Sequence, residues 1–132
     1  MSRELFWLTL TVALTGVLWV PYILDRIQTR GLMATLGNPQ EKDPPQSAWA
    51  ERLMRAHVNA VENLVVFAAL VLTAEALNIH SGLTAAACAT YFWARLAHAV
   101  VYTLGIPVAR TLAFAVGWVA QVALVLAIFG AA

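Results

Sequence analysis

The chain has 132 residues, of which 61% are hydrophobic and only 11% are charged, whereas an ordinary globular domain is roughly half apolar and a quarter charged. This is the composition of a membrane protein. The net charge of +1 and the dispersed basic residues argue against nucleic acid as a partner. The single cysteine, Cys88, excludes an internal disulfide, and the Cys and His residues lack the spacing of metal ligands, so we expect no metal site.

Residues 5–24 form the first candidate membrane span. They carry no formal charge, and about twenty helical residues cross the hydrocarbon layer of a bilayer. No small-residue cleavage site follows the apolar core, so we interpret this segment as part of the mature protein rather than as a signal peptide. Residues 111–132, at the other end of the chain, are similar in length and equally free of charge.

Residues 26–49 form a polar connection after the first span. Three of the five prolines lie here, in the breaker sequences "NP" and "DPP". We therefore expect an ordered polar loop within one domain rather than a linker between two. Ser47, in "SAWAER", is the predicted N-cap of the next helix.

Two interrupted apolar segments, residues 55–77 and 83–104, lie between the outer spans. The short sequences "LNIHSG" and "GIP" separate these helices from each other and from the last one. Together the four segments predict an all-α integral membrane four-helix bundle in a single domain, residues 1–132. The predicted helices cover about 5–25, 50–77, 83–104 and 108–131.

The distribution of basic residues predicts the orientation of the bundle. The first connection and the first turns of the second helix together contain five Lys or Arg residues near the span ends, the second connection contains none, and the third ends at Arg110. Because basic connections stay in the cytoplasm, we expect both termini on the periplasmic side of a bacterial inner membrane.

Each inner helix carries a polar stripe. On the second helix the stripe falls within an arc of about 60° over about 10 Å of axis, and the third helix repeats the spacing of three and four. Ionisable groups at membrane depth generally face a bundle interior or a wet cavity. The stripes consist of Arg55, Asn59 and Glu62 on the second helix and of Arg95, His98 and Tyr102 on the third.

Two interpretations of the stripes are open. In the first, Glu62 neutralises Arg95, Arg55 reaches the headgroups and the amide between them only packs helices. In the second, Arg55, Arg95, Arg110 and Arg30 outnumber Glu62 near this membrane face, and the excess positive charge binds an anionic ligand. Arginine suits carboxylates because its planar fork makes two parallel hydrogen bonds.

Two segments resemble signatures of the membrane-associated proteins in eicosanoid and glutathione metabolism, the MAPEG family. They are "ERLMRAHVNAVENLVVF" at residues 51–67 and "ARLAHAVVYTLGIPVAR" at residues 94–110, and the "NP" of the first connection also matches. The resemblance covers most of the chain. It is greater to microsomal glutathione transferase and prostaglandin E synthase than to leukotriene-C synthase, because Asn63 and His98 stand where the last has tyrosines.

The resemblance implies a homotrimer that binds glutathione, as a cosubstrate, between neighbouring subunits on the cytoplasmic half. The implied catalytic residues are Arg110, which would face the glutathione sulfur, and Tyr102. Arg30 would join the site from the first helix, with Arg26 as the alternative. The implied glutathione-binding residues are Arg30, Arg55, Asn59, Glu62, Arg95, His98 and Tyr102.

The expected function is a membrane-bound glutathione transferase, peroxidase or both, acting on lipophilic electrophiles or lipid hydroperoxides that enter from the bilayer. One alternative is a non-catalytic lipid-binding protein of the same family. Another is a small multidrug transporter. Such a carrier needs a carboxylate deep in its first span, and residues 5–24 contain none.

Overall fold

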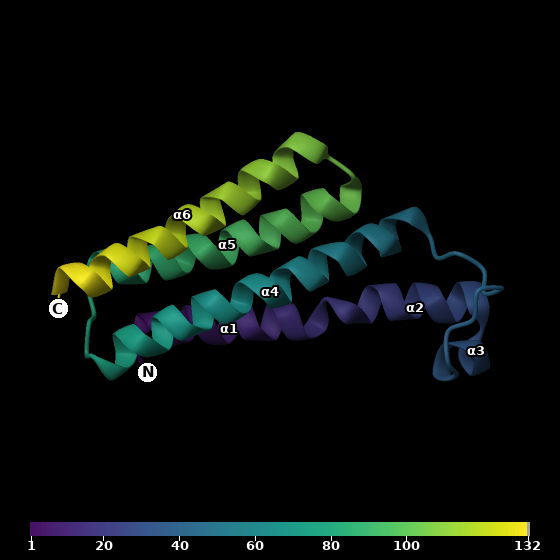
Figure 1. Cartoon of the computed structure of the whole chain (residues 1–132), viewed down its shortest axis with the longest axis horizontal. Coiled ribbons are helices and arrows are strands. Elements are labelled where there is room, and N and C mark those ends of the chain that lie inside the picture. The colour runs from purple at the N-terminus through teal and green to yellow at the C-terminus, as the bar shows by residue number, and fades with distance from the viewer. Residues whose placement is uncertain (132) are drawn as a thin grey trace.

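A computed structural model of the chain describes residues 1–131, which contain helices and no strand (Figure 1). The helices form elongated rods that lie side by side. The N-terminus, the α4–α5 turn and the C-terminus lie at one end of the molecule, and α3 and the α5–α6 turn lie at the other. The elements are α1 (Arg3–Val17), α2 (Trp19–Arg30), α3 (Leu32–Leu36), α4 (Ala48–Ala76), α5 (Gly82–Leu104) and α6 (Pro107–Ala131).

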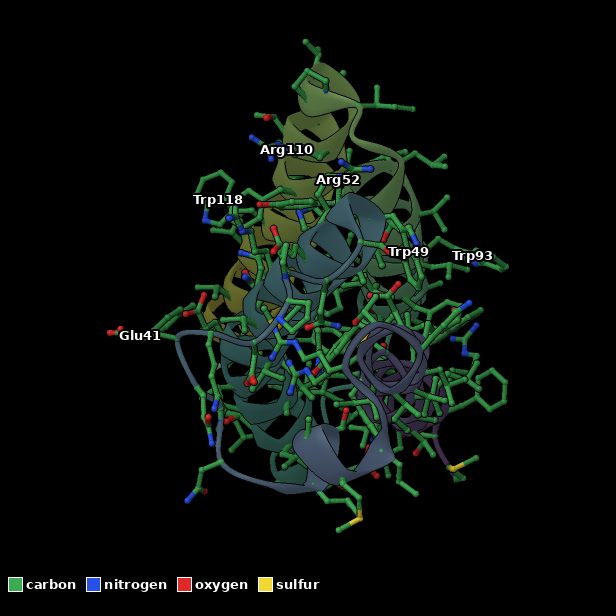
Figure 2. The ribbon with its side chains drawn as sticks, turned by 90° about the vertical axis from the view of Figure 1, so that its right-hand side faces the viewer. Glu41, Trp49, Arg52, Trp93, Arg110 and Trp118 are labelled. Atoms are coloured by element: carbon green, nitrogen blue, oxygen red, sulfur yellow. The ribbon has the colours of Figure 1, made fainter. Side chains whose placement is uncertain are left out.

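Three helical stretches are long and apolar enough to cross a membrane: Arg3–Arg30, which joins α1 and α2, then α4 and α6. This is the architecture of an integral membrane protein. Helix α5, the fourth rod, is not among these three. Its apolar residues are interrupted by Arg95 and His98. Large apolar side chains remain exposed along the rods, as lipid contact requires. Trp93 and Trp118, 58% and 57% exposed, point to opposite sides of the molecule (Figure 2).

The first rod breaks at Leu18 because of Pro21. Proline has no N–H to donate to the carbonyl of Val17, four residues earlier, so this carbonyl loses its helical bond. At the break, the Leu18 N–H donates to the Thr15 carbonyl, three residues earlier, at 3.4 Å. The helix then continues to Arg30, through residues expected to lie in the loop. Gly31, with φ of 84°, ends it, and the short α3 follows within the ordered connection.

Polar contacts define the other helix ends. Ser47 precedes α4 as predicted, although its side chain makes no capping bond; its N–H donates instead to Asp25 Oδ2 at 3.0 Å, which ties α2 to α4. Ser81 and Thr84 form a capping box at the start of α5. Gly105 ends α5 with φ of 79°, a conformation that favours glycine.

Helices α4 and α5 lie at the centre of the packing. Each contacts α1 and α6 as well as the other, whereas α6 makes no contact with α1 along the described chain. Phe67 of α4 stacks on Tyr91 of α5 with 3.8 Å between ring centroids. Small residues let α6 approach α5 closely: a Cβ added to Gly117 would lie 3.7 Å from the Ala94 Cβ.

Candidate functional site

A hydrogen bond joins the two polar stripes. Arg95 Nη2 on α5 donates to Asn59 Oδ1 on α4 across 2.8 Å, and the Arg95 residue is only 4% exposed. The antiparallel α4 and α5 therefore place these stripes against each other at mid-helix. The Arg95 side chain is buried, and the half-buried Asn59 lies between it and the protein surface. Arg95 therefore influences this surface through its positive charge and through the side chains that it contacts.

The Arg95 guanidinium sets the orientation of two neighbours. Because Asn59 Oδ1 accepts from Arg95, the Asn59 Nδ2 group remains as a donor at the half-buried surface. Arg95 Nη2 also lies 3.5 Å from Nδ1 of the buried His98. A guanidinium has no lone pair to offer, so His98 Nδ1 acts as the acceptor and a neutral ring carries its proton on Nε2.

Arg110 completes the group from α6. Its Cζ lies 4.6 Å from the ring centroid of Tyr102, a cation–π geometry. The Tyr102 ring in turn meets His98 edge-on, with 5.5 Å between centroids. The tight turn at Gly105 allows this contact, because it brings the start of α6 back over the last turn of α5. Tyr102 and Arg110 are both half-buried.

Arg55 and Glu62 lie on the exposed face of α4. Among the described residues, the only arginine–carboxylate ion pair within 4.0 Å joins Arg30 to Asp43. Glu62 therefore does not neutralise Arg95, which removes that part of the first interpretation of the stripes. Arg55, Arg95 and Arg110 all lack a carboxylate partner within residues 1–131.

Arg30 and Arg26 contact the loop and not the stripes of their own chain. Arg30 Nε donates to the Pro44 carbonyl at 2.7 Å. Arg26 Nε donates to Gln46 Oε1 at 3.1 Å, and its Nη2 lies 3.8 Å from Met54 Sδ. Both arginines thus hold the connection against α2 and α4.

Arg52 is a structural residue that the sequence analysis did not single out. Its Nε donates to the Thr103 carbonyl at 2.9 Å, which satisfies a free carbonyl in the last turn of α5. Its guanidinium packs 3.3 Å from the position that a Cβ on Gly105 would occupy. In Figure 2, which looks along the helices, Arg52 and Arg110 both lie in the upper part of the view. Arg52 therefore fixes the turn from which Arg110 projects.

The model of the MAPEG family matches residues 5–130. The chain belongs to the MAPEG family. The match includes both stripes and Arg110, and MAPEG proteins include glutathione transferases, related membrane proteins and non-enzymatic members. No curated protein and no solved structure matched the chain.

Proposed function

We propose that this MAPEG protein is a membrane-bound glutathione-dependent transferase or peroxidase, similar to the microsomal glutathione transferase and prostaglandin E synthase members. The observation that carries the proposal is the excess of positive charge: Arg55, Arg95 and Arg110 lack carboxylate partners among the described residues. A small acidic peptide complements this positive charge. Glu62, on the same helix as Arg55, is exposed and can accept a hydrogen bond from an amine of that peptide.

Glutathione has two carboxylates, one amine and one thiol, and each finds a complementary group. Arg55 would bind a carboxylate through its planar fork, while Glu62 would accept from the amine. Asn59 Nδ2 would donate to the peptide from the direction that Arg95 sets. Arg95 and His98 are buried. In this proposal they act mainly by orienting the neighbouring side chains, and Arg95 adds positive electrostatic potential; direct contacts with the peptide are secondary.

The thiol must lose its proton to become a nucleophile. A free thiol has a pKa of about 8.5, and lowering it by two units needs about 2.7 kcal/mol of differential stabilisation. The Arg110 guanidinium would supply this by facing the sulfur, and the Tyr102 hydroxyl would donate a hydrogen bond to the same atom. Positive charge within a few ångströms favours the thiolate over the thiol.

Two reactions follow from a bound thiolate. With an electrophile that carries a leaving group, sulfur forms a bond to carbon and the leaving group departs with its electron pair. With an electrophile that undergoes addition, sulfur forms the bond to carbon and the resulting anion takes up a proton. With a lipid hydroperoxide, sulfur attacks the terminal oxygen and the O–O bond breaks, which gives the glutathione sulfenic acid and a lipid alkoxide. The alkoxide takes a proton from water to become the lipid alcohol. A second glutathione then converts the sulfenic acid to the disulfide and water. In both cases the apolar substrate would enter from the bilayer.

The exposure of Arg55 and Glu62 supports assembly into the homotrimer. Two ionisable groups on the outer face of a spanning helix are unfavourable against lipid, at about 2.5 to 3.5 kcal/mol or more for a charge at the bilayer centre. A second copy packed on this face would cover them and bring its own Arg30 or Arg26 toward the ligand. From the basic connections we further propose that the site faces the cytoplasmic side of a bacterial inner membrane, with both termini periplasmic.

A glutathione titration of the purified protein tests this function, with oxidised glutathione and cysteine as controls. We expect binding of glutathione in preference to both. In Glu62→Gln we expect a roughly tenfold higher Kd with unchanged assembly, because a charge-assisted hydrogen bond to the amine becomes a neutral one. The matched control is Glu41→Gln, on the exposed loop. Equal affinity in wild type and Glu62→Gln would refute the amine contact.

A non-catalytic lipid-binding role is the second candidate. It is favoured by an apolar groove of about 430 Å³ between α5 and α6, lined by residues such as Leu83, Ala86 and Val119. A lipid-binding member would take up acyl chains without binding glutathione. The same titration therefore separates the two functions.

A further inference from the structure

The break in the first rod leaves part of α5 uncovered. Helix α1 packs against α5, but α2, beyond the break at Leu18, packs against α4 and makes no contact with α5 within residues 1–131. The last turns of α5 therefore lack a neighbour on this side. A second apolar groove, of about 250 Å³, lies there between α1, α4 and α5. Its lining includes Leu18, Leu53, Leu96, Val100, Thr103 and Leu104.

This groove lies on the side of the bundle that the proposed trimer leaves to lipid. Val100 and Leu104 are 50% and 65% exposed. On the helical wheel of α4, Leu53 lies about 160° from Arg55 and about 180° from Glu62. A second copy that covers Arg55 and Glu62 would therefore pack on the opposite side of α4. The choice of lipid over a second copy in the groove rests on this proposed assembly.

A cation lies at the rim of the groove. Arg52, in the second turn of α4, donates through Nε to the carbonyl of the lining residue Thr103 at 2.9 Å. Its two Nη groups make no hydrogen bond or ion pair with the part of the chain that the structure describes, and the groove lining contains no acid. A guanidinium has five N–H donors, so most of them remain for a ligand. A phosphate fits them because it accepts two parallel bonds from the planar fork.

The rim of the groove lies at the depth of the lipid headgroups. Arg52 belongs to the first turns of a helix long and apolar enough to span the membrane, Ala48–Ala76. Trp49, one turn earlier, is 39% exposed, and tryptophans are enriched where hydrocarbon meets headgroups. Trp93 extends the stripe of Leu96 and Val100 on α5 toward the middle of the helix, and it lies on the same side of the molecule as Trp49 in Figure 2. The groove therefore runs from the headgroup layer into the hydrocarbon.

We propose that this groove binds one anionic phospholipid of the bilayer, with an acyl chain along α5 and the phosphate on the Arg52 guanidinium. Basic pockets between membrane-spanning helices bind anionic lipid headgroups in this manner. The groove is smaller than the roughly 300 to 1,000 Å³ of sites for drug-sized molecules, so it suits a single flexible chain better than a ring system. The acyl chain fills the groove by packing, and Arg52 supplies the preference for an anionic lipid. The site does not use glutathione.

Native mass spectrometry of the full-length protein tests the proposal. The protein is released from detergent that holds equal amounts of phosphatidylglycerol and phosphatidylcholine with the same acyl chains. We expect phosphatidylglycerol to be retained about fivefold more than phosphatidylcholine, the effect of one basic side chain at the membrane surface. Equal retention of the two lipids would overturn the proposal.

A third arm adds inorganic phosphate, which has the charge and lacks the chain. It should not displace the phosphatidylglycerol, because the acyl chain holds the lipid in the groove. Displacement by phosphate would show an anion site that does not need the groove, and would also overturn the proposal.

Two variants separate the headgroup contact from the chain contact. Arg52→Gln should lose the preference for phosphatidylglycerol, whereas Arg3→Gln, an exposed arginine at the other end of the first rod, should keep it. Val100→Trp fills the groove and should lose most of the retained lipid. Its matched control is Val12→Trp, on α1 with 49% exposure, which should retain the lipid. An unchanged preference in Arg52→Gln, or unchanged retention in Val100→Trp, would refute the assigned contact.

The variants stay informative if one of them is unstable. Arg52 also fixes the Gly105 turn, so Arg52→Gln can fail to fold; Val100→Trp leaves that turn intact and then decides the proposal. The same spectra report the oligomeric state. If Val100→Trp dissociates the assembly, the groove holds a second copy and the lipid site is refuted. Retention of phosphatidylglycerol by a protein that does not bind glutathione supports this site and refutes only the proposed function.

Discussion

The guanidinium of Arg110 lies over the ring of Tyr102, with 4.6 Å between its Cζ and the ring centroid. The contact joins the first turn of α6 to the last turn of α5 across the Gly105 turn. It therefore gives a mobile arginine side chain a defined place beside a phenol. In the proposed mechanism this pair meets the glutathione sulfur, with the charge from one residue and the hydroxyl from the other.

Replacing Tyr102 by Phe or by Leu separates the two contributions of the phenol. Phe keeps the aromatic face that holds Arg110 and loses only the hydroxyl, whereas Leu loses the cation–π contact as well, worth about 0.5 to 1 kcal/mol at a partly exposed site. We expect glutathione thiolate to be reduced in Tyr102→Phe and reduced further in Tyr102→Leu. Equal thiolate signals in the two variants would show that the ring does not place Arg110.

Asn59→Leu should destabilise the protein because it removes the acceptor of a buried guanidinium. Arg95 Nη2 would keep only its long contact with His98 at 3.5 Å, and an unpaired buried donor costs about 1 to 3 kcal/mol, more when charged. Thermal unfolding in detergent should show a lower Tm. The control is Val58→Leu, at the neighbouring exposed position, which should leave the Tm unchanged. An unaltered Tm in Asn59→Leu would mean that Arg95 finds another partner.

Gly105→Ala should disturb the turn that carries Arg110. An L-residue at a left-handed φ costs roughly 1 to 2 kcal/mol, and the new Cβ would lie 3.3 Å from Arg52 Cζ and Nε. We expect a lower Tm together with less glutathione thiolate. Gly82→Ala is the matched control, because its Cβ would meet nothing within 4 Å and its φ is not left-handed. A Gly105→Ala protein as stable as Gly82→Ala would contradict the role of this turn.

The periodicity of the sequence was sufficient to find the stripes and the turns. Spacings of three and four identify which residues share one face of a helix, and Gly105 and Pro107 mark a break. These features depend on local geometry alone, and local geometry can be read from one chain.

The partner of Arg95 was not predictable in the same way. Helical spacing places Arg95 on a face but does not give the rotation of α5 against α4, and that rotation selects Asn59 rather than Glu62. The extension of the first rod to Arg30 was missed because its last turns are polar. Their contacts with the ordered connection, such as Arg30 with Asp43, stabilise helix where charge alone suggested loop.

The central claim is that Arg55, Arg95 and Arg110, which have no carboxylate partner among the described residues, bind glutathione and ionise its thiol. The most direct measurement is the ultraviolet absorbance of thiolate when glutathione is added to wild-type protein and to Arg110→Met, with Arg3→Met, at the far end of the chain, as control. We predict a thiolate signal at neutral pH in wild type and Arg3→Met that is lost in Arg110→Met. A full signal in Arg110→Met, or no signal in wild-type protein saturated with glutathione, would contradict the account.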